Sequence, residues 1–182
     1  MLNNFDYVHA ETLENALEHL STGDDNIIPI SGGTDVLVQI RYKNISPKKL
    51  VDIRDLKELK EIKEDKDYFY IGASITFDNI IKNKGIQSNF PLLVSASKEV
   101  GSPQIRNLGT LAGNVQTASP AGDGLLALYA LNSKVELVSK KGKRQCSLKD
   151  FIIGPKKTAK RPDEIIKKFI IPKKEWDFQQ FF

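Results

Sequence analysis

The chain has 182 residues, with 27 Lys or Arg against 23 Asp or Glu and a formal net charge of +4. This length accommodates one large domain or two small lobes with a buried core, and the 40% hydrophobic content argues against disorder. One cysteine and two histidines exclude an internal disulfide, a redox-active CxxC pair and a cysteine- or histidine-rich metal site. No run reaches the roughly 20 apolar residues of a membrane span. No signal peptide is visible either, so we expect a cytoplasmic protein.

The N-terminal part alternates helical and strand patterns. Apolar residues recur at helical spacing in some segments and form short runs in others, which predicts an α/β lobe with parallel strand pairing over about residues 1–84. Residues 54–66 are charge-rich and predict a turn or a short helix. The predicted helices cover 13–20, 36–40 and 76–81, and the predicted strands cover 26–30, 50–53 and 68–71.

The pattern resets near Gly85, which predicts a second lobe over about residues 85–175. A helical face over 92–100 precedes residues 101–123, which contain four glycines and little periodicity. We expect this stretch to be irregular, and so long an irregular stretch in a compact domain is normally functional. A helix from Leu125, a hairpin over 135–147 and a strand over 164–171 complete the lobe.

The first candidate site is a strand, a Gly-Gly turn and a helix in succession. Glycine lets backbone N–H groups point into a shared concavity, and no side chain blocks a ligand lying close to the backbone. The following helix start adds partial positive charge that suits a diphosphate, although such a turn is also common as a purely structural feature. The candidate residues are Ile30, Ser31, Gly32, Gly33, Thr34, Asp35, Val36 and Leu37.

A second turn of small residues could hold another part of the same anion, and its structural alternative is an ordinary tight loop. Its residues are Thr110, Leu111, Ala112, Gly113 and Asn114. Further along, Ser119 is placed to cap a helix starting at Pro120, with Asp123 in the first turn, where the helix dipole favours a carboxylate. Asp123 has a functional alternative as hydrogen-bond acceptor for a polar ligand.

The remaining polar residues indicate no catalytic machinery. The sequence suggests neither a Ser-His-Asp set nor a pair of catalytic carboxylates, so we expect no catalytic residue on this chain. His9 and His19 are predicted to be ordinary surface residues, and Cys146 a packing residue in a strand. Basic clusters at 140–144 and 156–161 favour solvated charge. They lack the interleaved aromatic residues that a nucleic-acid-binding domain would need.

Taken together, these segments resemble the FAD-binding subunit or domain of molybdenum hydroxylases, the group that includes xanthine dehydrogenase and the medium subunit of carbon monoxide dehydrogenase. The resemblance lies in several motifs in order and covers nearly the whole chain. Its most specific part is the run over 101–114, continued by 118–123. The other matching segments are 31–37, 71–76, 150–154 and 163–166.

The resemblance implies an α+β fold of two α/β lobes with FAD extended between them. Both turns would hold the diphosphate, Asp123 would lie beside the flavin half, and Ile165 or Ile166 would pack near the ring or the ribityl chain. In this family, electrons pass from a molybdopterin-binding large subunit, through an iron–sulfur small subunit, to FAD and then to NAD or another acceptor. Molybdopterin, iron–sulfur clusters and metals are thus expected only on partner subunits.

Two departures from the family pattern stand out. The second turn usually carries two adjacent glycines, and here the first of them is Ala112. Family members usually continue into a further C-terminal domain, which we expect to be missing here. We therefore predict an FAD-binding domain over 1–175 and the start of a truncated C-terminal segment over 176–182. The alternative function is a stand-alone flavin- or nucleotide-binding module without redox partners.

Overall fold

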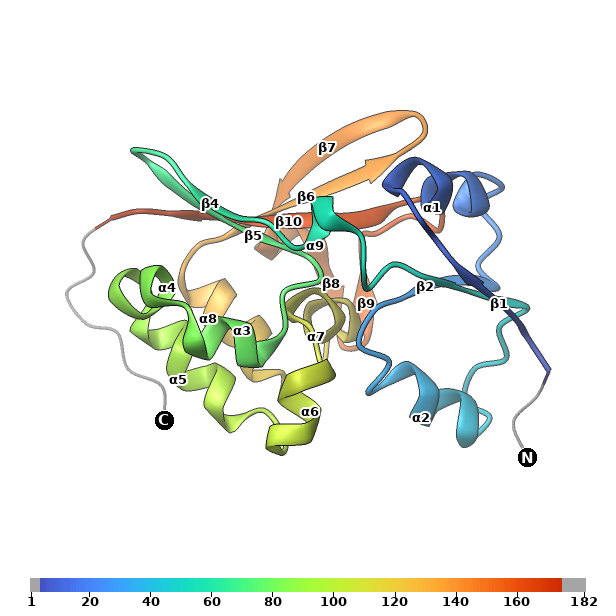
Figure 1. Ribbon diagram of the computed structural model, residues 1–182, viewed down its shortest axis with the longest axis horizontal. Coiled ribbons are helices and arrows are strands. Elements are labelled where there is room, and N and C mark those ends of the chain that lie inside the picture. Colours follow the sequence, from blue (N-terminus) through green and yellow to red (C-terminus); the bar gives the residue numbers. More distant parts are fainter. Residues whose placement is uncertain (1–3, 175–182) are drawn as a thin grey trace.

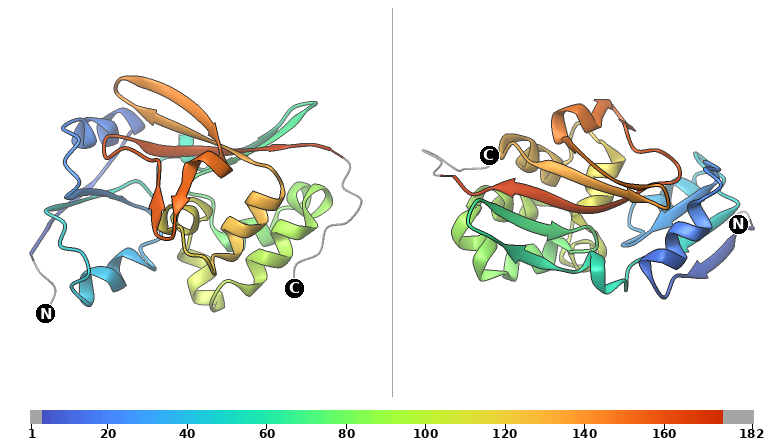
Figure 2. Two further views of the ribbon diagram at one scale, coloured as in Figure 1. Left: turned by 180° about the vertical axis from the view of Figure 1, so that it is seen from behind. Right: turned by 90° about the horizontal axis from the view of Figure 1, so that it is seen from above.

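A computed structural model describes residues 4–174, which form two main sheets lying side by side (Figures 1 and 2). The first sheet has three parallel strands in the order β1-β3-β2. Parallel strands need crossover connections, and two helices supply them here. The elements are β1 (Asp6–His9), α1 (Leu13–Leu20), β2 (Ile27–Ile30), α2 (Val36–Arg41) and β3 (Lys49–Asp52).

The second sheet is antiparallel, with five strands in the order β4-β5-β10-β6-β7. A short 3-10 helix, η1 (Lys57–Leu59), leads into it from the first sheet, and a two-stranded ribbon lies beside it. Its strands are β4 (Ile62–Glu64), β5 (Tyr68–Gly72), β6 (Lys134–Ser139), β7 (Gly142–Ser147) and β10 (Ile165–Pro172), and the ribbon is β8 (Ile152–Gly154) with β9 (Lys157–Thr158).

A layer of short helices packs beneath the second sheet (Figure 1). Most of them start at a capping residue: the Thr76 side chain, for example, accepts a hydrogen bond from the N–H of Asn79 at 3.2 Å, and the Asn79 side chain returns the contact. The helices are α3 (Phe77–Lys82), α4 (Lys84–Asn89), α5 (Pro91–Glu99), α6 (Pro103–Leu108), α7 (Leu111–Thr117), α8 (Asp123–Ala130) and α9 (Leu148–Phe151).

A large hydrophobic core joins the two sheets, and a small second cluster of Ile30, Ile40 and Leu50 packs α2 against β2 and β3. The large core runs from Leu17 and Leu20 of α1 to Phe169 of β10, and burial of each such side chain stabilises the fold by roughly 1.5–3 kcal/mol. Phe69 of β5 and Phe90 meet edge to face within this core, with ring centroids 5.5 Å apart. The fold is therefore mixed α+β, as the sequence predicts, and Cys146 packs against the core from β7.

The direction of β5 corrects the expectation of parallel pairing through residue 71. β5 pairs antiparallel with both β4 and β10. The pairing with β4 follows from a tight turn, in which the Asp65 side chain accepts the N–H groups of Asp67 and Tyr68 at 2.9 and 2.7 Å. The chain thus leaves the first sheet after Asp52 and enters the second at Ile62, well before the expected change near Gly85. The domain limits 1–175 stay a prediction, and residues 176–182 lie outside the described residues.

Residues 101–123 are also more regular than expected, because two helices lie within them. Ser102 and Thr110 accept N–H groups of the following first turns at 3.3 and 3.1 Å, and Pro103 takes the first position of α6. Strand β1 is an element that the sequence pattern did not reveal, since only one of its four side chains is even partly buried. In residues 4–174, no helix has both the length and the apolar character to cross a membrane.

Candidate functional site

A cavity of about 670 Å3 lies where the two glycine turns meet residues of the second sheet. All but two of the sequence-predicted site residues line it. The exceptions are Leu37, which is exposed on α2, and Leu111, which is buried in the core. The predicted residues that line the cavity are Ile30, Ser31, Gly32, Gly33, Thr34, Asp35, Val36, Thr110, Ala112, Gly113, Asn114, Asp123, Ile165 and Ile166.

The first turn, residues 31–35, is shaped by its two glycines. A Cβ on Gly32 would lie 2.1 Å from the carbonyl oxygen of Leu108, so only glycine lets the first turn approach the end of α6. Gly33 adopts φ +71°, the left-handed region that favours glycine. Among residues 4–174, the N–H groups of Gly32, Gly33 and Thr34 have no hydrogen-bond acceptor. The turn therefore presents free donors at the cavity.

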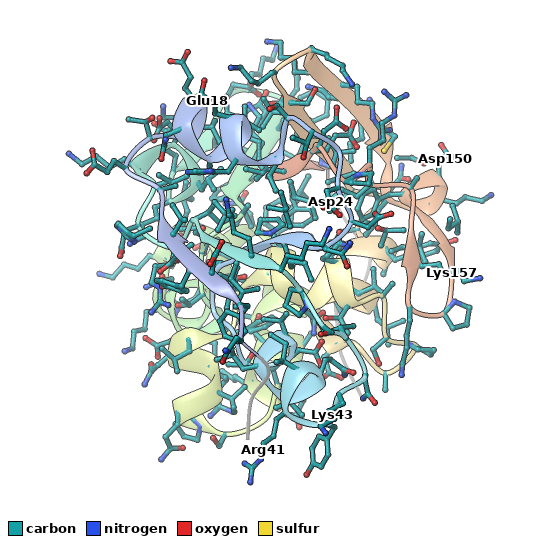
Figure 3. All side chains as sticks on the ribbon, turned by 90° about the vertical axis from the view of Figure 1, so that its right-hand side faces the viewer. Glu18, Asp24, Arg41, Lys43, Asp150 and Lys157 are labelled. Atoms are coloured by element: carbon teal, nitrogen blue, oxygen red, sulfur yellow. The ribbon has the colours of Figure 1, made fainter. Side chains whose placement is uncertain are left out.

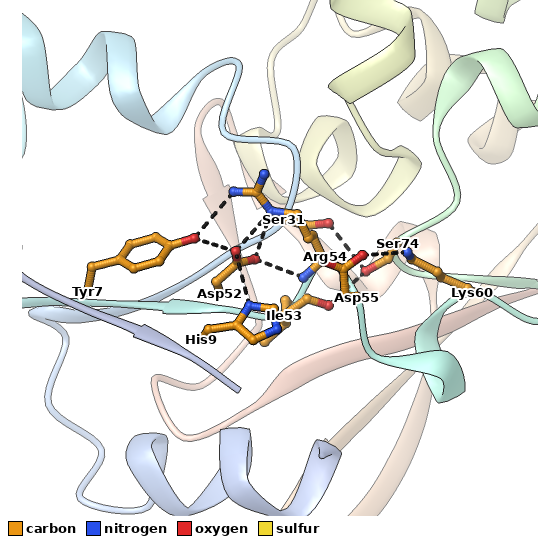
Figure 4. A network of polar contacts seen from close by, with 9 residues as sticks. All are labelled: Tyr7, His9, Ser31, Asp52, Ile53, Arg54, Asp55, Lys60 and Ser74. Carbon is orange, nitrogen blue, oxygen red and sulfur yellow. Dashed lines mark hydrogen bonds and ion pairs between the residues drawn. The ribbon is translucent and has the colours of Figure 1, made fainter. Parts of the chain in front are cut away.

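The first turn is tied to the end of β3. The N–H of Ile53 donates to the Ile30 carbonyl at 2.8 Å, and the Ser31 hydroxyl lies 3.2 Å from that of Ser74, which donates to the Ile53 carbonyl at 3.3 Å (Figure 4). These contacts fix the position of the turn relative to both sheets, since Ser74 lies two residues after the end of β5.

Buried Asp52 lies at the centre of a charged network behind this turn (Figure 4). Its carboxylate accepts the Tyr7 hydroxyl and the Arg54 guanidinium, whose Nε is 2.9 Å from Oδ2, and the Nδ1 of His9 lies 3.6 Å away. Burial alone would raise the pKa of Asp52, but the hydrogen bonds from Tyr7 and Arg54 outweigh it and lower that pKa. The hydrogen bond to Asp52 raises the pKa of Tyr7. His9, expected to be an ordinary surface residue, thus has a buried partner.

The second turn, residues 110–114, forms the N-cap and first turn of α7 and is supported by neutral groups. The Thr110 side chain accepts the N–H of Gly113, and its carbonyl accepts the N–H of Asn114, both at 3.1 Å. The N–H of Ala112 finds no acceptor among the described residues. Among residues 4–174, and apart from the backbone of α7 itself, a Cβ on Gly113 would meet only the Thr110 hydroxyl, at 3.1 Å. The Asn114 side chain accepts the N–H of Leu125 at 2.9 Å and fixes α8 beside the turn.

Asp123 lies in the first turn of α8 and lines the cavity, as the sequence predicts. The expected cap at Ser119 is wrong, because α8 begins later, with Gly122 at its N-cap position. The Ser119 side chain instead accepts the N–H of Ala121 at 3.3 Å. The Thr117 hydroxyl lies 3.0 Å from the carbonyl of Gly113 and 3.3 Å from the carboxylate of Asp35, so it connects α7 to the N-cap residue of α2.

Two lysines of the 156–161 cluster also line the cavity, namely Lys156 and Lys160. For Lys160 the expectation of solvated charge is wrong, since it is half-buried. Sequence reasoning missed these two lining residues because Lys156 lies in the turn before β9 and Lys160 in the loop after it, and tertiary packing places both segments. Val100 and Ile105 line the cavity from the end of α5 and from α6, and their position there also depends on tertiary packing.

A second groove of about 600 Å3 shares Ser31, Gly32, Ser74 and Thr110 with the cavity. Three cations line it, but each already has a carboxylate partner. Arg54 pairs with Asp52 at 2.9 Å, Lys60 with Asp55 at 2.8 Å and Lys82 with Asp78 at 2.7 Å. This groove therefore has little uncompensated charge. The part of the chain that the structure describes contains no group of three His, Cys, Asp or Glu side chains that could hold a metal ion.

The cavity, its free N–H donors and its order of motifs agree with the family resemblance. The sequence profile of the family described as "FAD binding domain in molybdopterin dehydrogenase" matches residues 3–174. The chain belongs to this family. The nicotinate dehydrogenase FAD-subunit of Eubacterium barkeri is 38% identical to this chain over 176 residues. That match covers 93% of this chain and 59% of the relative.

Other members of the family give the same result. The xanthine dehydrogenase FAD-binding subunit of Escherichia coli O157:H7 is 32% identical, over 91% of this chain and 57% of its own length. Among solved structures, reconstituted CO dehydrogenase from Oligotropha carboxidovorans superposes with a TM-score of 0.93 at 27% identity, over 96% of this chain and 61% of that one. The chain thus spans about 60% of the length of these relatives, which are subunits of molybdenum-hydroxylase-type dehydrogenases.

Proposed function

We propose that this chain binds FAD in the cavity between its two glycine turns. The observation that carries the proposal is that both turns bring N–H groups without an acceptor to one cavity, together with space that a single Cβ on Gly113 would fill. Backbone donors without side chains are well suited to phosphate oxygens. A cavity of this volume is also within the range of cofactor sites.

The lining residues fit the three chemical parts of FAD. The N–H groups of Gly32, Gly33, Thr34 and Ala112 would bind the diphosphate. Ile165 and Ile166, buried on β10, offer an apolar wall for an aromatic ring. Asp123 would accept hydrogen bonds from a ribityl hydroxyl or a ring N–H. Most of the predicted lining positions in the two turns are Gly, Ala, Ser or Thr, so FAD would meet mainly backbone and small side chains there. The protein would orient the cofactor and would need no acid or base of its own.

We further infer that the chain is the FAD subunit of a molybdenum-containing dehydrogenase in the cytoplasm. Its relatives are the FAD-binding or medium subunits of nicotinate, xanthine and carbon monoxide dehydrogenases. Bound FAD would take electrons from an iron–sulfur small subunit, which receives them from a molybdopterin-binding large subunit, and deliver them to NAD or another acceptor. This chain would hold the flavin in position and exclude water from the cavity.

The first experiment is the visible absorption spectrum of the purified protein, followed by identification of any cofactor released on denaturation. We expect a flavin spectrum and release of FAD. If the protein is purified without cofactor, added FAD should bind at one equivalent. Failure of both would contradict the proposed function.

Affinity purification of the tagged chain from its own cells tests the wider role. Recovery of molybdenum- and iron-containing chains in fixed ratio supports the electron-transfer subunit. Recovery of a flavin-loaded chain alone, at native expression level, supports the alternative of a stand-alone flavin-binding module.

A further inference from the structure

Lys160 is a half-buried cation that lines the FAD cavity from the loop between β9 and β10. Its ammonium group donates hydrogen bonds to the carbonyl oxygens of Arg161 and Glu164, at 3.0 and 3.1 Å. An ammonium has three N–H donors. One donor and the full positive charge are therefore left without a matched partner, since no ion pair of Lys160 occurs within residues 4–174.

The carboxylates nearest to Lys160 are committed to other cations. Asp163 pairs with Lys141 at 3.0 Å. Glu164 accepts two bonds from Arg144, at 2.6 and 2.8 Å, in the bidentate form that makes such a pair strong. Burial lowers the pKa of Lys160, and the charges of Glu164, Asp163 and Asp25 raise that pKa by less. The protein itself thus provides incomplete compensation for this charge.

The other charged residues of the cavity lining are Asp35, Asp123 and the exposed Lys156. Neither Asp35 nor Asp123 is among the carboxylates that raise the pKa of Lys160. Oxidised FAD carries its formal negative charges on the diphosphate, while its flavin and adenosine parts are neutral. A buried cation without a countercharge is stabilised when an anion enters the same cavity.

We propose that the Lys160 ammonium is the cavity's side-chain countercharge for the FAD diphosphate, complementing the backbone donors of the two glycine turns. This inference rests on the proposed function. It adds to the proposed FAD site a residue that lies outside both glycine turns. Lys160 would then be a binding residue that discriminates phosphorylated ligands from neutral flavins.

The test compares Lys160→Met with the wild type and with Lys157→Met as the matched control. Methionine keeps the length of the side chain and removes its charge. Lys157 is exposed on β9 and does not line the cavity (Figure 3). Each apoprotein is titrated with FAD, ADP and riboflavin at low salt. Thermal unfolding of the apoproteins checks the fold, and we expect Lys160→Met to retain the wild-type melting temperature or exceed it.

We expect Lys160→Met to bind FAD and ADP at least tenfold more weakly, since a charge-assisted hydrogen bond of about 1.4 kcal/mol corresponds to tenfold in affinity. Riboflavin, which lacks the diphosphate, should bind equally to all three proteins, and Lys157→Met should stay within twofold of the wild type. FAD affinity of a folded Lys160→Met within twofold of the wild type would overturn the proposal. So would an equal loss for riboflavin.

The result for the wild type separates this proposal from the proposed function. If the wild type binds ADP but not FAD, the proposed flavin binding is contradicted. The role of Lys160 is then still tested by comparing the ADP affinities of Lys160→Met and the wild type. If the wild type binds none of the three ligands, both proposals fail.

Discussion

The two glycine turns face the same cavity, but their glycines are required for different reasons. In the first turn, Gly32 is needed by the fold itself, because the carbonyl oxygen of Leu108 occupies the space where a Cβ would lie. In the second turn, a Cβ on Gly113 would meet only the Thr110 hydroxyl among residues 4–174, apart from the backbone of α7 itself. Gly32 is therefore explained by packing alone, whereas Gly113 borders cavity space that the proposed ligand would fill.

The supports behind the two turns differ as well. The first turn is tied to β3, next to the charged network of Asp52, Arg54 and Tyr7. The second is held by the uncharged side chains of Thr110 and Asn114. Changes of pH should therefore act on the first turn more than on the second.

The largest effect is expected for Gly32→Ala. Its Cβ would force the first turn and α6 apart, and overpacking of this kind costs about 3 kcal/mol of unfolding free energy, with loss of FAD binding. Urea unfolding measures the change. The control is Gly154→Ala, where a Cβ meets nothing within 4 Å, and it should stay within about 0.5 kcal/mol of the wild type. Equal stability of the two variants would remove the distinction between the turns.

The second prediction concerns Asp52→Asn. The folded-state pKa of Asp52 lies below its ordinary value of 3.8, so its contribution to stability is complete above that pH and is lost as pH falls through the lowered pKa. Replacing the carboxylate should lower the unfolding free energy near neutral pH by about 2 kcal/mol. The variant should also lose part of the acid dependence below pH 3.8. Unfolding curves at neutral and acid pH measure both, and identical pH profiles for variant and wild type would contradict the network's role.

A smaller effect on stability, but a clear effect on binding, is expected for Gly113→Ala. Alanine favours the helix by up to about 1 kcal/mol over glycine, and this offsets the tight contact with Thr110. The added methyl group occupies space assigned to the diphosphate, so FAD affinity should fall at least tenfold, or about 1.4 kcal/mol. Ala112→Gly is the matched variant and should bind FAD as well as the wild type or more tightly. Wild-type affinity of a folded Gly113→Ala would mean that the second turn does not hold the phosphates.

The smallest effect is expected for Asp123→Asn, which keeps the shape of the side chain and removes its charge. The helix dipole favours the carboxylate by about 0.5 kcal/mol. A small loss of stability is therefore expected whether or not Asp123 contacts FAD. A hydrogen bond to the flavin half should also shift the reduction potential of bound FAD. A variant with an unchanged potential would leave Asp123 with the dipole contact alone.

The sequence predicted the parts of the site whose local pattern is tied to their geometry. Small residues in two turns predicted that Gly33 and Gly113 would face one anion, and the family resemblance implied that Asp123 would lie beside the same ligand. All three residues line one cavity. Their binding roles stay predictions. Lys160 was missed because its burial depends on how β9 and β10 place the loop between them, which no local pattern encodes.

The direction of the strands could not be obtained in the same way. A helix–strand alternation fits both parallel and antiparallel pairing, and the outcome for β5 depends on the tight turn at Asp65. Similarly, residues 101–123 have too few apolar positions to show helical periodicity. The only local signals of their helices are the capping residues Ser102 and Thr110, which did not enter the prediction.

The measurement that tests the central claim most directly is hydrogen–deuterium exchange of the protein with and without FAD. In both turns some N–H groups have no acceptor within residues 4–174, namely those of residues 32–34 and of Ala112. If one FAD molecule is held by both turns, the amide exchange rates of both turns should fall together as FAD is added. Both rates should follow the fraction of protein that has FAD bound. FAD that binds while either turn keeps its unliganded exchange rate would contradict the account.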